Sequence, residues 1–170
     1  MSATTSFVDF AGLVAFLEAN QIPHAVDRER QLLELASKAP PFTANLLIKW
    51  EKQLPFVSII QFMIDDVPEA RIPDLETAIT RLNCALEVGG LGFDHSTRRL
   101  FQRTIAPVFA PEGITASTFN KLTHGTVAQA KDLYPSLKAV IDGRPGKDVA
   151  QIARELSQSA APAAPAAPAS

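Results

Sequence analysis

The stretch PFVSIIQFMI, residues 55–64, decides the fold of this chain, because it predicts a β-strand with apolar side chains on both faces. One face would carry Phe56, Ile60, Phe62 and Ile64, and the other Val57, Ile59 and Met63. Leaving the second set in water would forgo roughly 5–9 kcal/mol, which is comparable with the net stability of a whole domain. Either the chain's own helices cover that second face or a partner does, and the pattern favours neither alternative.

Two further segments before this strand also have β-like patterns. Residues 45–52, NLLIKWEK, alternate between apolar and polar side chains and lie only a short connection away, which indicates an antiparallel hairpin. Residues 31–37, QLLELAS, could form a strand or a helical turn, and we expect a strand. Residues 7–20 repeat apolar side chains at helical spacing, so we expect a helix that Ser6 caps.

The second half of the chain predicts a helix, a hairpin and a longer helix. The first helix begins near Pro73, and residues 87–107 then read as two strands joined by the polar turn DHST. The last helix starts after Thr115 or Ser117 and runs toward Asp142-Gly143. Pro135 should kink or split it.

The predicted fold class is therefore α+β, an antiparallel sheet flanked by helices in the order αβββαββα plus a short C-terminal helix. We expect this domain to span residues 1–143 and the short helix to span 144–158. Residues 159–170, with their AAP repeats, predict an extended, disordered Ala/Pro tail.

Composition excludes several classes of function. The formal net charge of −2 gives no global attraction to nucleic acid or to an anionic membrane, and we expect neither as a partner. A single cysteine, Cys84, excludes an internal disulfide, and its apolar surroundings predict a small buried side chain. No signal peptide and no apolar run of about 20 residues is visible, which predicts a cytoplasmic location.

No set of residues indicates a catalytic or metal centre. His24, His95 and His124 lie in different elements, and the acidic group at 65–69 lacks the pattern of an ion-binding loop. The glycine-rich GGLGF at 89–93 follows a helix and leads into a strand, the reverse of a phosphate-binding loop. The sequence predicts no catalytic residues, no metal, no cofactor and no enzymatic activity.

A small basic patch marks the last predicted strand. Arg98, Arg99 and Arg103 lie close together, and alternation places Arg99 and Arg103 on the same face as Phe101 and Ile105. Arginine beside aromatic side chains is typical of interfaces, although ordinary exposure to solvent explains the pattern as well.

The segment LETAITRLNCALEVGGLGFDHSTRRLFQRTI, residues 75–105, resembles the YbjN-like family. The shared pattern is a helix containing LN, a glycine-containing link, a strand ending in FD, a polar turn and a return strand. YPSLKAVIDG at 134–143 and the order of elements from residue 7 to about 143 also match. The return strand has Leu100-Phe101 where an aromatic pair is usual. The family is similar in fold to the small chaperones of type III secretion, which implies a frequently dimeric domain that binds polypeptides.

The first functional hypothesis is thus a chaperone-like or regulatory protein-binding module, whose partner is another protein or a second copy in a homodimer. It would use an apolar surface of the sheet and helices, with Val57, Ile59, Met63, Arg99 and Phe101 in contact with the partner. The alternative is a small-molecule sensor or enzyme with a pocket between sheet and helices, using Asp65, Asp66 or His124. A further alternative is an adaptor that functions through its AAP tail.

Overall fold

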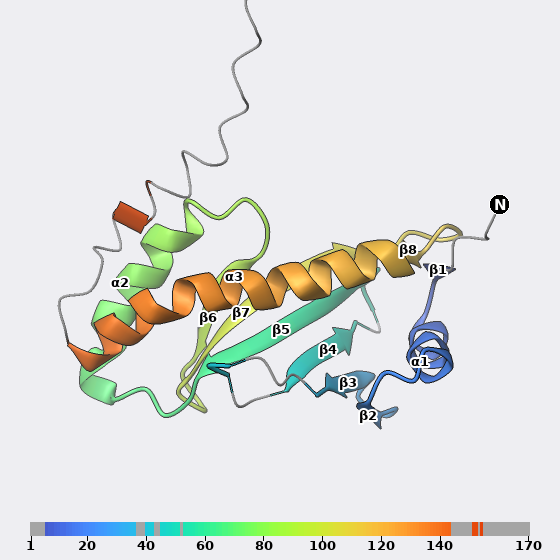
Figure 1. Cartoon of the computed structure of the whole chain (residues 1–170), viewed down its shortest axis with the longest axis horizontal. Helices are drawn as coiled ribbons and strands as arrows, with labels where there is room; N and C mark the ends of the chain where they lie inside the picture. The colour runs from blue at the N-terminus through green and yellow to red at the C-terminus, as the bar shows by residue number, and fades with distance from the viewer. Residues whose placement is uncertain are drawn as a thin grey trace, which may run out of the picture.

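The computed structural model describes residues 6–36, 40–42, 45–51 and 53–143, together with 151, 152 and 154. The Ala/Pro tail expected at 159–170 lies outside the described residues. So does the short helix expected at 144–158, except for residues 151, 152 and 154. Within them, a large antiparallel sheet carries helices on one side (Figure 1).

The main sheet has six strands in the order β2-β3-β4-β5-β7-β6, with every neighbouring pair antiparallel. The strands are β2 (His24–Asp27), β3 (Leu32–Leu35), β4 (Leu46–Trp50), β5 (Phe56–Ile64), β6 (Gly90–Asp94) and β7 (Arg99–Pro107). The strand that opened the sequence analysis is β5, and it lies in the interior of the sheet between β4 and β7.

The helices are α1 (Phe10–Ala19), α2 (Ile72–Asn83), which follows the 3-10 turn η1 (Glu69–Arg71), and α3 (Ala116–Asp142). A second, two-stranded sheet pairs β1 (Ser6–Phe7) with β8 (Ile114–Thr115). The predicted α+β class with an antiparallel sheet is confirmed. The predicted order omitted β1, β2 and β8, which are short and have no apolar periodicity of their own.

The first helix begins later than expected, because Phe7 pairs with Ile114 in the small sheet. Asp9 rather than Ser6 caps the helix, and its Oδ1 accepts a hydrogen bond from the Gly12 amide at 2.7 Å. The prediction for Cys84 was also wrong. It lies just beyond the end of α2, where the chain leaves the helix, and its side chain is exposed.

The long helix α3 lies lengthwise along β5 and β7 (Figure 1). Of the two outcomes expected at Pro135, a kink or a split, the split does not occur, and the helix runs unbroken from Ala116 to Asp142. Leu133 and Leu137, on either side of the proline, are buried in the core, and this packing offsets the loss of one backbone hydrogen bond. Gly143 ends the helix in the left-handed conformation, as predicted.

The chain's own helices cover the face of β5 that the sequence analysis left open. Val57 and Ile59 are 0% exposed and Met63 is 6% exposed. Val57 and Ile59 lie in a core cluster with side chains of α1 and α3, and Met63 lies in a second cluster with side chains of α2 and α3. These three residues therefore form the core and offer no surface to a partner, which corrects the prediction that they would contact one.

A β-bulge changes the direction of the last residues of β5. Phe62 pairs with Phe101, but Ile64 pairs with Leu100, so the register shifts between them. Leu100 is fully buried, and Ile64 packs against the same core cluster. Ile64 therefore leaves the face that simple alternation assigned to it and points toward the helices.

Buried polar side chains lie between the sheet and α3. Gln61 and Gln102 are opposite one another on β5 and β7, both 0% exposed, and Gln102 donates a hydrogen bond to Gln129 of α3. The hydroxyl of Thr126 on α3 lies 2.8 Å from that of Thr104 on β7. These bonds fix where α3 crosses the sheet, because a displaced helix would leave buried polar groups without partners.

Candidate functional site

The side of the sheet turned away from the helices is the main candidate site, and we name it the open face. No helix among the described residues packs against it. Its apolar side chains are half-buried or exposed, and they include Leu32 of β3, Leu47 of β4, Phe56, Ile60 and Phe62 of β5, and Phe101 and Ile105 of β7. A solvated face of an antiparallel sheet is normally polar, so this run of apolar side chains is typical of a contact surface.

Arg99 and Phe101, which the sequence predicted to contact a partner, both lie on the open face. Phe101 meets Phe62 across the strands, edge to face, with ring centres 6.2 Å apart. Arg99 lies over the Phe62 ring, with its guanidinium carbon 3.8 Å from the ring centre. Arg99 Nε also donates a hydrogen bond to Asp65 Oδ1 at 2.6 Å.

The three arginines of the basic patch, Arg98, Arg99 and Arg103, lie in different environments. Arg99 is engaged by Asp65 and Phe62, and Arg98, in the turn before β7, lies 3.9 Å from Asp66. Arg103 is exposed, and no carboxylate of the described residues lies within ion-pairing distance of it. Arg103 is therefore the arginine of this patch whose charge is available to a ligand.

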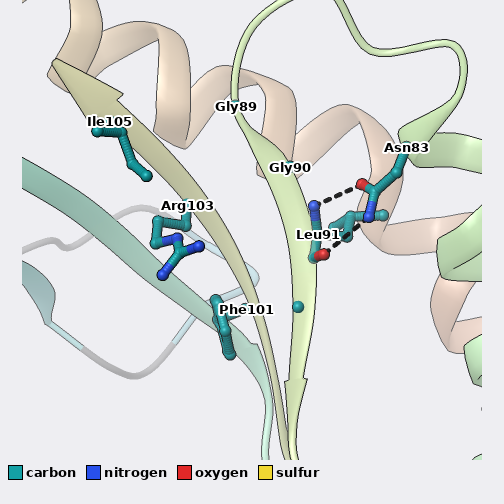
Figure 2. A pocket seen from close by; sticks show the side chains of 8 residues that line it. Asn83, Gly89, Gly90, Leu91, Phe101, Arg103 and Ile105 are labelled. Carbon is teal, nitrogen blue, oxygen red and sulfur yellow. Dashed lines mark hydrogen bonds between the residues drawn. The ribbon is translucent and has the colours of Figure 1, made fainter.

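A trough runs along the open face beside β7 (Figure 2). Its volume is about 500 Å³, and it is lined by Asn83, Gly89, Gly90, Leu91, Gly92, Phe101, Arg103 and Ile105. Figure 2 shows Phe101, Arg103 and Ile105 in a row along β7, next to the part of β6 at Gly90. A Cβ atom at Gly92 would come within 2.3 Å of the Phe101 ring, so only glycine fits beneath that ring.

Asn83 at the end of α2 closes the outer edge of β6. Its side-chain amide donates to the Leu91 carbonyl at 2.9 Å, and its Oδ1 accepts from the Leu91 amide at 2.7 Å (Figure 2). The side chain thus takes the place of a neighbouring strand at this position. This geometry gives a physical reason for the LN in the sequence pattern, which is Leu82-Asn83 here, because the asparagine side chain connects the end of α2 to the edge strand by hydrogen bonds.

The turn between β6 and β7 has a similar basis for the FD of the pattern. The carboxylate of Asp94 accepts hydrogen bonds from the Ser96 amide at 2.9 Å, the Ser96 hydroxyl at 2.6 Å and the Thr97 hydroxyl at 2.7 Å. The side-chain hydrogen bonds from Ser96 and then Thr97 lower the pKa of Asp94 to about 2. His95 lies in this turn as predicted, 3.0 Å from Glu76.

A second hollow, which we name the α3 groove, lies on the helical side of the sheet. Its volume is about 580 Å³, and it is lined by Ile22, Pro23, Leu35, Ala36, Leu46, Thr123, His124, Val127, Ala128 and Lys131. Its walls are mainly apolar. His124, one of the residues named for a small-molecule pocket, lies here, whereas Asp65 and Asp66 do not line the groove and pair with arginines just after the end of β5. The structure does not bring these three residues together.

The described residues contain no group of His, Cys, Asp or Glu side chains placed to hold a metal ion. In the same part of the chain, no helix has the length and apolar character that crossing a membrane requires.

A one-sided antiparallel sheet, with helices α1 to α3 on one face, defines the class of this fold. Among solved structures, the chain is similar to YbjN from E. coli, a proposed transcription regulator, with a TM-score of 0.51 and 13% sequence identity. The match covers 81% of this chain and 93% of that chain. This chain therefore has a YbjN-like fold, and the resemblance seen in the sequence is confirmed at that level. No protein-family model and no curated protein sequence matches the chain.

The site residues that the sequence missed include Ile60 and Phe62 of β5, which pair with Arg103 and Phe101 of β7. The pattern of β5 could not distinguish its faces, since both are apolar with one polar residue each, Ser58 and Gln61. The sequence feature that could have identified the open face is in β7, where the charged residues Arg99 and Arg103 indicate which face is in contact with solvent. Because Ile60 pairs with Arg103 and side chains opposite one another share a face, β7 identifies the open side of β5.

Proposed function

We propose that this chain is a non-enzymatic protein-binding module, a regulator or adaptor that holds a segment of a partner polypeptide against its open face. The observation that carries the proposal is the run of apolar side chains on a sheet face without a covering helix. Ile105 is 46% exposed there, and Phe62 and Phe101 form an aromatic pair further along the same face. Protein interfaces are enriched in aromatic side chains and arginine, and their buried centres are largely apolar.

The known neighbour in fold agrees with a regulatory role, since YbjN is described as a proposed transcription regulator. Direct binding of nucleic acid is less well supported in this chain. The net charge is −2, and two arginines of the basic patch are paired with aspartates. A regulator of this kind would act through contact with another protein.

The experiment is a selection of random displayed peptides against the purified protein, followed by measured affinities for variants. Ile105→Asp places a charge on the open face, and Val8→Asp does the same at an exposed apolar residue, 49% exposed, outside that face. We expect Ile105→Asp to weaken the selected peptides by about tenfold or more, and Val8→Asp to leave them unchanged. Circular dichroism would establish that both variants are folded. Equal affinities for the wild type and a folded Ile105→Asp would refute the proposal.

The second candidate function is that of a small-molecule sensor. The one observation in its favour is the α3 groove. Leu35, Leu46 and Val127 give it an apolar wall, and His124 and Lys131 lie at its margin. An environment-sensitive apolar dye would test this candidate. Its fluorescence should rise with the wild type and fall when Val127→Trp fills the groove, whereas an unchanged signal in that variant would exclude this site.

A further inference from the structure

We propose that the trough selects one pattern of partner sequence, an extended segment with an acidic residue flanked at alternate positions by apolar residues. This inference rests on the proposed function and assigns the chemistry of the ligand. The acidic side chain would pair with Arg103, and the two apolar side chains would pack on Phe101 and Ile105.

The spacing of the β7 side chains matches that of an extended peptide. Phe101, Arg103 and Ile105 are alternate residues of one strand, and such residues recur on the same face every ~6.6 Å. A peptide in the extended conformation presents its own alternate side chains with the same repeat. It can therefore meet all three in register, whereas a helix places neighbouring side chains of one face three or four residues apart.

Gly90 leaves room for such a peptide beside Arg103. It lies opposite Arg103 and projects no side chain next to the row, whereas the Phe101 ring itself covers Gly92. The hollow of about 500 Å³ is lined along one side by the β7 side chains and at its outer end by Asn83 of α2. Ile105 on the far wall is 46% exposed and available for contact.

Charge decides the middle position of the pattern. Arg103 carries the only charge among the described residues that line the trough, and no described carboxylate pairs with it. A glutamate or aspartate of the ligand would supply the missing partner through charge-assisted hydrogen bonds, and a lysine at this position would be repelled.

The edge of the sheet explains why the peptide lies on the face and does not extend the sheet. Asn83 occupies both the amide and the carbonyl of Leu91 at the outer edge of β6. A strand added at this edge would have to displace those hydrogen bonds. The face, by contrast, is already free, and a strand stacked on it would contact the sheet through side chains.

The test uses two labelled synthetic peptides and fluorescence anisotropy. In one, a glutamate is flanked at alternate positions by leucines, with threonines between them, and in the other a lysine replaces the glutamate. We expect the wild type to prefer the glutamate peptide by about tenfold, because the exchange removes an attraction and adds a repulsion. Arg103→Glu should invert this preference, and Arg103→Gln should abolish it. Arg81→Glu, an equal charge change at an exposed position on α2, should retain it.

The outcomes separate this inference from the proposed function. If both peptides bind the wild type equally and Ile105→Asp weakens both, the open face binds polypeptides but the acidic preference is wrong. If neither peptide binds while the peptides selected by display do, the pattern is wrong and the function stands. A glutamate peptide that becomes helical when bound, by circular dichroism, would also overturn the inference.

Discussion

The guanidinium carbon of Arg99 lies 3.8 Å from the centre of the Phe62 ring, while its Nε donates a hydrogen bond to Asp65. One side chain thus connects β7 both to the aromatic pair of the open face and to the segment that follows β5. This arrangement holds Phe62 and Phe101 in place at the surface, so the open face has a fixed shape before any partner binds.

Replacing Arg99 should therefore destabilise the fold more than replacing Arg103. Arg99→Met loses the ion pair and the contact with the ring, and we expect the free energy of unfolding to fall by about 1 kcal/mol. Arg103→Met, which breaks no ion pair among the described residues, is the matched control and should change it by less than about 0.5 kcal/mol. Urea unfolding of both variants measures the difference, and equal effects would contradict the assignment.

The hydroxyls of Thr104 and Thr126 should show coupled energetics. Each is buried, and Thr126→Val leaves the Thr104 hydroxyl without this partner, at a cost of about 1–2 kcal/mol. Thr104→Val should cost less, because the Thr126 hydroxyl also donates to the Leu122 carbonyl at 2.8 Å. The double variant removes both groups, so its cost should be smaller than the sum of the single ones by about 1 kcal/mol. Additive costs in a double-mutant cycle by urea unfolding would show that the two hydroxyls are not coupled.

Asn83→Ala should expose the edge of β6. The change removes both hydrogen bonds to Leu91 and should lower the free energy of unfolding by about 1–2 kcal/mol. An unpaired edge also favours pairing between chains, so light scattering should detect association that depends on protein concentration. Asn120→Ala, at an exposed residue of α3, is the control. A variant as stable and as monodisperse as this control would contradict the role given to Asn83.

The turn at Asp94 predicts a dependence of stability on acid. The pKa of Asp94 is lowered in the folded state from 3.8 to about 2 by hydrogen bonds from Ser96 and Thr97. A depressed folded pKa stabilises the fold above the unfolded value, and this contribution is lost as the pH falls from about 4 to about 2. An NMR titration of the carboxyl carbon should show the pKa rising toward 3.8 in Ser96→Ala. No change in that variant would refute the stated cause.

The sequence predicted the elements of this fold better than their arrangement. Alternation in 45–52 and 55–64 identified β4 and β5, and helical spacing identified α2 and α3, because long apolar patterns report the face that must be buried. The short strand β2 has no such pattern. Pro135 does not split α3, because tertiary packing outweighs the local rule against proline inside helices.

The residues of the candidate site were predicted only in part, because the sequence does not show which face of β5 the helices cover. Arg99 and Phe101 lie on the open face, but Val57, Ile59 and Met63 are in the core. Both sides of β5 are apolar, and which one the helices cover depends on the connections to α1 and α3, which no short stretch encodes. The bulge that turns Ile64 inward is likewise a property of pairing with β7.

The most direct test of the central claim is methyl NMR of the protein during titration with a peptide selected by display. The claim predicts that the isoleucine methyl groups of Ile60 and Ile105 on the open face shift as the peptide binds. The methyl group of Ile59, one residue away on the buried face, should stay in place. Shifts confined to Val127 and Leu35 in the α3 groove, with Ile60 and Ile105 unchanged, would contradict the account.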